Sequence, residues 1–232
     1  MFKTKLITDF FSLFFPDLCN SCLAPMQNGE QVICTYCLFY LPRTGYHLRS
    51  DNPVLRLFRG RVEIEAAAAY YVFQKGGGVQ QLLHRLKYSG KTEVGIELGK
   101  MYGTDLKRSA LFSNVDLIIP VPLHSRKLKE RGYNQSEYFA IGLARSMHTV
   151  VDADSLIRVS PTETQTRKSR FSRWKNVGNV FRLVNPQNLE DRHILLVDDV
   201  ITTGATIEAC ALALQGAKNI RVSIAAIAIA NS

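Results

Sequence analysis

Apolar and polar residues alternate in blocks along this chain, and the blocks predict an α/β protein. Nearly continuous apolar runs predict strands at residues 63–73, 115–124, 156–159, 193–197 and 218–230. Helical periodicity fills the intervals at residues 75–90, 92–112, 134–148 and 204–215. Strands that alternate with helices favour a parallel sheet covered by helices on both faces.

The N-terminal part of the chain predicts a separate, smaller unit. We expect residues 1–47 to form a short helix and a four-cysteine module, residues 48–62 a linker, and residues 63–232 the α/β domain. The first residues resemble a signal peptide, but Asp9 interrupts a short apolar run and no small-residue cleavage site follows. No apolar run reaches the ~18 residues of a membrane span. We therefore expect a cytoplasmic protein without a membrane span.

Positive charge is concentrated in one part of the sequence. The chain has 29 Lys and Arg residues against 20 Asp and Glu residues, a net charge of +9. Residues 119–182 alone contain twelve Lys and Arg against five Asp and Glu. Such a surplus predicts an anionic partner, either a phosphorylated small molecule or a nucleic acid.

Four of the five cysteines have the spacing of a zinc site. Cys19, Cys22, Cys34 and Cys37 follow the pattern C-x2-C-x11-C-x2-C. Each C-x2-C turn presents two thiolates to one ion, and two turns complete a tetrahedron. Disulfides would not suit a cytoplasmic chain, and a redox motif needs one pair only. The pattern favours structural Zn²⁺, while Cys210 lies on an apolar helix face and is expected to be buried.

The stretch LLVDDVITTGAT at residues 195–206 places two carboxylates next to a loop of small residues. In a parallel sheet, ligands bind beyond the carboxyl ends of the strands, where Asp198 and Asp199 are expected. Adjacent carboxylates repel unless cations or hydroxyls meet them, and a vicinal diol supplies two hydroxyls. Thr202, Thr203, Gly204, Ala205 and Thr206 then lead into a helix, where backbone N–H groups can bind phosphate. Together these features predict a site for a ribose 5-phosphate.

Rival motifs fit this stretch less well. The chain has neither the G-x-x-x-x-G-K-[ST] run of a P-loop nor the G-x-G-x-x-G run of a dinucleotide-binding fold. A phosphoacceptor receiver domain needs more chain after its paired aspartates than the one helix and one strand expected here. A turn without a ligand is the remaining alternative.

The stretch ILLVDDVITTGAT resembles the phosphoribosyl pyrophosphate (PRPP) binding loop of type I phosphoribosyltransferases. The whole chain resembles the ComF family of competence-associated proteins, which belongs to that superfamily. The resemblance extends from the four-cysteine module to the last strand. It includes HRLKYSGK (84–91), IPVPLHSRKLKERGYNQSE (119–137) and TETQTRKSRFSRWKNVGNVF (162–181).

The resemblance implies roles for individual residues. Asp198 and Asp199 would hold the ribose hydroxyls of PRPP or of a ribose-5-phosphate nucleotide, and residues 202–206 would hold the 5′-phosphate. Arg126 and Lys127 would bind the pyrophosphate, although a solvated basic turn is the alternative. Mg²⁺ would bridge pyrophosphate and ribose oxygens.

The basic segment RKSRFSRWK (167–175) is expected to form a flap. It combines five cations with Phe171 and Trp174 and contains no acid. The flap would close over PRPP in an enzyme. On a DNA-binding surface, Arg167, Arg170 and Arg173 would follow phosphates while Trp174 stacks on a base.

Two functions from different classes follow from these motifs. The family resemblance implies a protein that retains a PRPP site and assists the uptake of single-stranded DNA in natural transformation, with a DNA-uptake helicase as a further partner. The alternative is an active, Mg²⁺-dependent phosphoribosyltransferase that acts on PRPP and an unidentified base or amine, with Asp198 and Asp199 as its catalytic residues.

Overall fold

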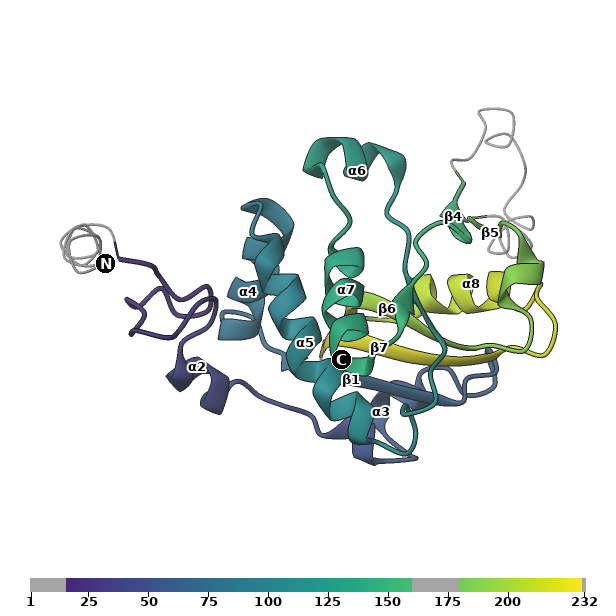
Figure 1. The fold of residues 1–232 in the computed structure, drawn as a ribbon, viewed down its shortest axis with the longest axis horizontal. Coiled ribbons are helices and arrows are strands. Elements are labelled where there is room, and N and C mark those ends of the chain that lie inside the picture. The colour runs from purple at the N-terminus through teal and green to yellow at the C-terminus, as the bar shows by residue number, and fades with distance from the viewer. Residues whose placement is uncertain (1–15, 160–179, 231–232) are drawn as a thin grey trace.

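The structure is a computed structural model that describes residues 16–159 and 180–230. Its main feature is a five-stranded parallel sheet (Figure 1). The strand order is β1 (Ala66–Phe73), β7 (Arg221–Ala230), β6 (His193–Ile201), β2 (Leu117–Pro120) and β3 (Val150–Val151). All four neighbouring pairs of strands are parallel.

Helices cover both faces of this sheet. The cluster on one face joins Ala66, Ala68 and Leu195 to α4 (Gly78–Tyr88), α5 (Thr92–Arg108) and α7 (Gln135–Met147). The alternate strand residues Ala67 and Ala69 point to the other face, which α8 (Ala205–Leu214) covers. The predicted fold class, an α/β protein with a parallel sheet between two helical layers, is confirmed.

Shorter elements connect these layers. Within the described residues they include α2, a 3-10 helix, α3, α6, an antiparallel pair of strands and a second 3-10 helix. Their bounds are Thr35–Tyr40, Tyr46–Leu48, Pro53–Arg56, Ser125–Arg131, β4 Leu156–Arg158 with β5 Phe181–Leu183, and Pro186–Leu189. None of the helices in the described ranges has the length and apolar character that crossing a membrane requires.

Two strands end at positions that differ from those expected from the sequence. β2 ends at Pro120 rather than at residue 124, because Pro122 follows closely and proline cannot continue a ladder inside a sheet. β6 continues beyond Val197 to Ile201, because β7 still pairs with it at Val200 and Ile201. Asp198 and Asp199 therefore lie within β6, on the part that extends past β2.

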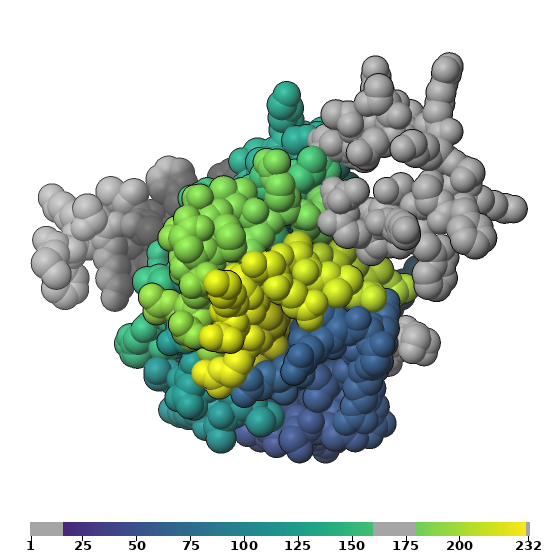
Figure 2. All heavy atoms as spheres, turned by 90° about the vertical axis from the view of Figure 1, so that its right-hand side faces the viewer, coloured from purple at the N-terminus to yellow at the C-terminus, as the bar shows by residue number. Residues whose placement is uncertain are grey.

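The segment 48–62, for which the sequence predicts a linker, packs closely against the sheet. Val54 and Phe58 are buried beneath β1, and Asn52 caps α3 through the N–H groups of Val54 and Leu55. In Figure 2 the blue surface of this part of the chain lies directly against the yellow C-terminal region. The division of the chain at residues 47 and 62 stays a prediction.

Candidate functional site

The two aspartates of β6 lie side by side but meet different partners. One oxygen of Asp198, Oδ1, accepts hydrogen bonds from Ser136 Oγ at 3.0 Å and from the backbone N–H of Asp199 at 2.8 Å. Burial and the neighbouring Asp199 carboxylate raise the pKa of Asp198 to about 7, against the opposing effect of these hydrogen bonds. Near neutral pH the Asp198 carboxyl can therefore both donate and accept hydrogen bonds.

Asp199 forms an ion pair with a residue from a distant part of the chain. Its Oδ2 lies 2.8 Å from Nζ of Lys87, at the C-terminal end of α4. Both side chains are largely shielded, with exposed fractions of 14% for Asp199 and 24% for Lys87. This cation compensates part of the repulsion between the two carboxylates.

The loop after β6 leads into α8 through Gly204. Gly204 is left-handed, with φ at 76°, and precedes the first turn of α8. A Cβ at this position would also lie 2.9 Å from Cε1 of Phe58, so both the backbone conformation and the close approach of Phe58 require glycine. Arg61 holds the loop in place by donating hydrogen bonds to the Thr203 carbonyl and to the Glu208 carboxylate. The predicted linker thus supports the predicted phosphate loop.

The stretch RGYNQS at residues 131–136 fixes the start of α7 against the end of β2. Asn134 accepts from the N–H of Ser136 and donates to the carbonyl of Val121 at 3.0 Å. Gln135 accepts a hydrogen bond from Arg131. Asn134 is therefore the N-cap of α7, and it also orients Ser136 toward Asp198.

Three adjoining cavities form a series along this edge of the sheet. A narrow cavity of about 30 Å³ lies at residues 202–206. It shares Asp198 and Thr206 with a second cavity of about 220 Å³, the inner cavity, which also contains Asp199 and Ser136. A third cavity of about 360 Å³, the outer cavity, adjoins the inner cavity through Lys87, Tyr88, Lys127 and Arg131.

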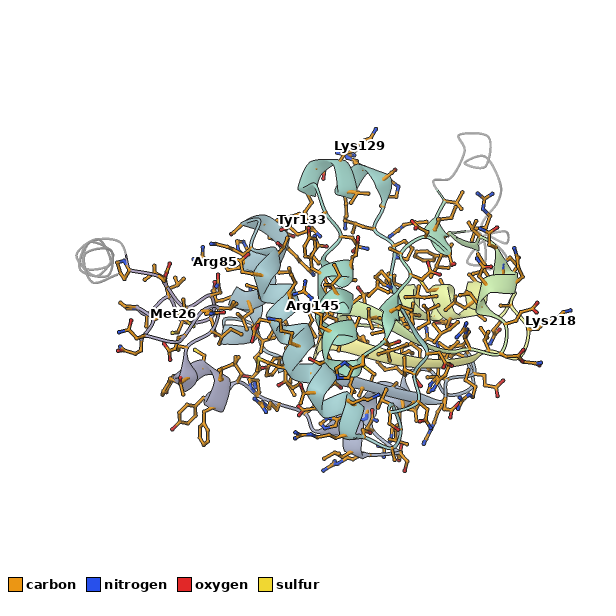
Figure 3. All side chains as sticks on the ribbon, viewed as in Figure 1. Met26, Arg85, Lys129, Tyr133, Arg145 and Lys218 are labelled. Carbon is orange, nitrogen blue, oxygen red and sulfur yellow. The ribbon has the colours of Figure 1, made fainter. Side chains whose placement is uncertain are left out.

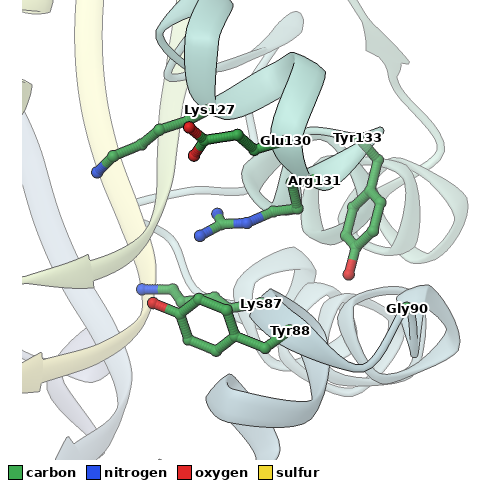
Figure 4. Close-up of a pocket in the computed structure, with 7 residues that line it drawn as sticks. All are labelled: Lys87, Tyr88, Gly90, Lys127, Glu130, Arg131 and Tyr133. Carbon is green, nitrogen blue, oxygen red and sulfur yellow. The ribbon is translucent and has the colours of Figure 1, made fainter.

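The outer cavity is rich in cations. Lys87, Lys127 and Arg131 extend toward the same side of it, as Figure 4 shows. The Arg131 guanidinium lies 5.3 Å from the ring centre of Tyr88, and Tyr133 closes the other side with a hydrogen bond from its hydroxyl to the Leu86 carbonyl. Tyr133 lies between α6 and α4, whereas Lys129 points outward from α6 (Figure 3). Glu130 also lines this cavity, so three cations stand against one carboxylate, and the excess of positive charge favours an anionic group.

The structure brings together some of the predicted site residues and leaves others outside. Asp198, the loop 202–206, Asp199 and Lys127 line the series of cavities. Arg126 is not among the lining residues: its side chain is 83% exposed, and its Nε lies 2.9 Å from Glu130, which itself lines the outer cavity. Residues Arg167, Arg170, Arg173 and Trp174 of the expected flap lie outside the described residues.

Several residues that line the cavities could not be assigned a role from the sequence alone. They are Lys87, Tyr88, Ser136 and Arg158, while Arg131 stands out only as part of a motif. One signal is present for Lys87, since it lies in the stretch HRLKYSGK. Its partner Asp199 is more than one hundred positions away, so only the fold reveals the contact.

The four cysteines of the N-terminal module converge as their spacing predicts. Their Sγ atoms all lie within 4.8 Å of one another, and the Sγ atoms of Cys22 and Cys34 are 3.7 Å apart. A tetrahedron with Zn–S bonds of about 2.3 Å has edges of about 3.8 Å, so this separation suits one ion. Cys210 is buried in the α8 cluster and is remote from the four.

The backbone around Cys19 favours its thiolate. Burial raises the pKa of Cys19, but N–H groups of Cys34, Cys22 and Ser21 outweigh it and lower that pKa to about 7. The N–H groups of Ser21 and Cys34 lie 3.4 and 3.3 Å from Cys19 Sγ. Burial raises the pKa of Cys34 and Cys37, so a cation is needed to hold these thiols deprotonated. The donor set can thus hold a metal ion.

An exposed group of aromatic residues lies on α2, beside the cysteines. Tyr36, Phe39 and Tyr40 have exposed fractions of 68%, 80% and 64%. Their rings contact one another, with centres 4.5 Å apart for Tyr36 and Tyr40 and 5.0 Å apart for Phe39 and Tyr40. We call these three residues the aromatic patch, since such exposed apolar groups mark interaction surfaces.

Proteins linked to DNA use and competence are similar to this chain along most of its length. DNA utilization protein YhgH of Salmonella typhi is 34% identical over 223 residues, which are 90% of this chain and 96% of that protein. The corresponding protein of Shigella flexneri is 30% identical over 227 residues, with the same coverage of both chains. Competence protein ComFC of Bacillus subtilis is 28% identical over 209 residues, 87% of this chain and 80% of that protein.

Two solved structures whose names contain the word phosphoribosyl match parts of this chain at low identity. Glutamine PRPP amidotransferase from B. subtilis matches 61% of this chain and 30% of its own, with 20% identity and a TM-score of 0.41. Adenine phosphoribosyltransferase from Leishmania tarentolae matches 82% of this chain and 94% of its own, with 12% identity and a TM-score of 0.38. No family model matches the sequence.

Proposed function

This chain belongs to the ComF family, and from that premise we propose that it retains a site for PRPP or a ribose-5-phosphate nucleotide and assists the uptake of single-stranded DNA in natural transformation. The observation that carries the first part is the series of three cavities. The cavity at the loop 202–206 comes first, the paired carboxylates follow it, and the cation-lined cavity comes last. In PRPP the 5′-phosphate, the ribose and the pyrophosphate follow one another in the same order.

The paired carboxylates suit a ribose because of their unequal partners. Asp199 and the free lone pairs of Asp198 would accept the two hydroxyls of a vicinal diol. The 5′-phosphate would meet the N–H groups at the start of α8 near Gly204, where the helix dipole favours an anion. DNA lacks the 2′-hydroxyl and hence the diol, so this site favours a ribonucleotide-type ligand over a DNA strand.

We assign the pyrophosphate end of PRPP to Lys127 and Arg131. Both side chains line the inner and outer cavities, whereas Arg126 pairs with Glu130. Mg²⁺ would accompany PRPP and neutralise part of the negative charge of its pyrophosphate. In the alternative function, an active Mg²⁺-dependent phosphoribosyltransferase, the carboxylates would stabilise the ribose as it gains positive charge and the cations would draw off pyrophosphate.

The four-cysteine cluster is proposed to hold one structural Zn²⁺. Four thiolates leave no open coordination position, so the ion would support the fold rather than react. Free thiols of this kind persist in a reducing compartment, and a cytoplasmic location is part of the proposal.

The second part of the proposal concerns single-stranded DNA. The names of the relatives connect those proteins with DNA use and competence. In this chain the aromatic patch on α2 supplies exposed rings on which bases could stack, and the net charge of +9 favours a phosphate backbone. The same module is the surface that we propose for docking a DNA-uptake helicase.

The ribose-phosphate site is tested by thermal unfolding in increasing PRPP with Mg²⁺. At about 100 times the dissociation constant, a ligand of the folded protein adds about 2.7 kcal/mol of stability. The native protein should gain this stability, and Asp199→Asn should not. No gain in the native protein would contradict a retained PRPP site.

The DNA function is tested separately by titration with single-stranded DNA at several salt concentrations. Affinity should fall steeply with salt, and Phe39→Ala with Tyr40→Ala should weaken it by about tenfold or more, since each stacked base contributes about 1–3 kcal/mol. Asp199→Asn is the matched control and should bind DNA as the native protein does. Unchanged affinity in the aromatic variant would contradict the role of the patch.

A further inference from the structure

Lys87 lies on the border between two cavities that we assign to different parts of one ligand. Its Nζ is 2.8 Å from Asp199 Oδ2, and its side chain lines both the inner and the outer cavity. Arg131, in contrast, is held by Gln135 and lies over Tyr88. Of the three cations in the outer cavity, Lys87 is thus the one bound to the carboxylate that a ribose diol would need.

The ion pair restricts Asp199 as long as no ligand is bound. A carboxylate that faces an ammonium group at 2.8 Å offers fewer lone pairs to a hydroxyl. Displacing a lysine from a largely shielded partner is costly unless another anion receives it. The outer cavity supplies a place for such an anion beside Lys127 and Arg131, and the acid in its lining, Glu130, is paired with Arg126. Lys87 has a flexible four-carbon stem, so a small change of rotamers can redirect its ammonium group.

We propose that Lys87 is a positioning residue: when an anion binds in the outer cavity, the Lys87 ammonium group leaves Asp199 and pairs with that anion. The diol and the anion then bind cooperatively. This inference rests on the proposed ribose-phosphate site. The anion draws Lys87 away from Asp199, and the freed carboxylate accepts the ribose hydroxyl. Binding of the diol likewise releases Lys87 toward the anion, because coupling between two ligands is reciprocal.

Calorimetric titration measures this coupling with two separate probes. Ribose 5-phosphate supplies the diol and the 5′-phosphate, and inorganic pyrophosphate with Mg²⁺ supplies the anion. In the native protein, saturating pyrophosphate should lower the dissociation constant of ribose 5-phosphate at least about fivefold, the lower end of common coupling strengths. Ribose 5-phosphate should strengthen pyrophosphate binding by the same factor.

Two substitutions separate the role of Lys87 from that of a general cation. Lys87→Gln should bind ribose 5-phosphate alone as well as the native protein or better, and pyrophosphate should no longer change that affinity. Lys127→Gln is the matched control: it should need more pyrophosphate to saturate but keep the coupling at saturation. Lys87→Arg should restore part of the coupling, and the thermal midpoint of each variant checks its fold.

The outcomes distinguish two kinds of failure. If the native protein does not bind ribose 5-phosphate at all, the proposed ribose-phosphate site is overturned together with this inference. If ribose 5-phosphate binds but pyrophosphate leaves its affinity unchanged or weakens it, only the inference is overturned. Coupling that persists undiminished in Lys87→Gln also overturns the inference.

Discussion

At the scale of single residues, Asp198 shows how the fold changes the chemistry of a predictable motif. The residue is half-buried at the end of β6 beside Ser136 and Asp199, and burial together with the Asp199 charge raises its pKa to about 7. An aspartate in the unfolded chain loses its proton near pH 3.8. Between these two values the folded protein binds more protons than the unfolded chain, so ionising Asp198 opposes folding.

The free energy of unfolding should therefore fall as pH rises from about 4 to about 7 and change little from this cause above it. Asp198→Asn removes the titrating group while keeping a hydrogen-bond acceptor for Ser136. We expect the stability difference between native protein and variant to shift by about 1 kcal/mol per pH unit below pH 7. Urea unfolding at pH values from about 5.5 to about 8.5 measures it. Parallel curves for the two proteins would contradict the assigned pKa.

Local sequence motifs predict some of the side chains that line the site, but they do not predict the side chains that contact them from distant parts of the chain. The paired aspartates, the loop at Gly204 and the four cysteines are continuous or regularly spaced motifs, and local geometry follows from such spacing. Lys87 comes from a helix far away in sequence, so its contact depends on the packing of α4. The choice between Arg126 and Arg131 depends on the orientation of α6, a short helix that the periodicity of the chain does not predict.

At the scale of elements, the close crossing of α5 and α7 controls the position of the site. A Cβ on Gly142 would lie 2.8 Å from Cα of Gly99, so the two backbones leave no room for a methyl group. α7 begins with the residues that fix Asn134 to β2 and Ser136 to Asp198. The separation of these two helices thus sets where Ser136 meets the aspartates.

Gly142→Ala should force α5 and α7 apart and destabilise the protein by about 1–3 kcal/mol, as overpacking does. Alanine otherwise favours a helix over glycine by about 1 kcal/mol, so a loss would mark the steric effect. Gly216→Ala, just after the end of α8, is a control for the added methyl group alone, because its nearest contact would be an ordinary 3.4 Å. Chemical unfolding measures both variants, and equal stability of the two would contradict the close crossing.

Helices and strands were predictable where periodicity alone determines them. The main helices and strands occur at the expected places, because apolar runs and helical stripes are local signals. The extension of β6 to Ile201 was not predictable, since it depends on β7 pairing after β2 has ended. The packing of residues 48–62 beneath β1 likewise depends on long-range burial of Val54 and Phe58, which a stretch rich in arginine does not indicate.

At the scale of the whole molecule, α4 joins the cysteine module to the proposed ribose-phosphate site. A Cβ on Gly78, the first residue of α4, would collide with Oγ of Ser21 and lie 3.1 Å from Leu41, so the module packs against this end. The other end carries Lys87 and Tyr88. Eleven helical residues span about 16 Å, which separates the module from the site by one rigid element. If the module loses its structure, α4 should therefore become less well fixed, and the position of Lys87 in the site should change with it.

Loss of the metal should consequently weaken both the fold and the site. Cys22 is exposed, so Cys22→Ser removes a ligand with little loss of packing. We expect zinc content to fall below one ion per chain, the thermal midpoint to drop by several degrees, and the affinity for ribose 5-phosphate to decrease, since a structural zinc site contributes directly to folding.

Cys210→Ser should keep the full zinc content, because Cys210 lies outside the cluster. Elemental analysis, thermal unfolding and calorimetry measure the three effects. Full zinc occupancy in Cys22→Ser would contradict the four-cysteine site, and unchanged ligand affinity after zinc loss would contradict its connection to the site through α4.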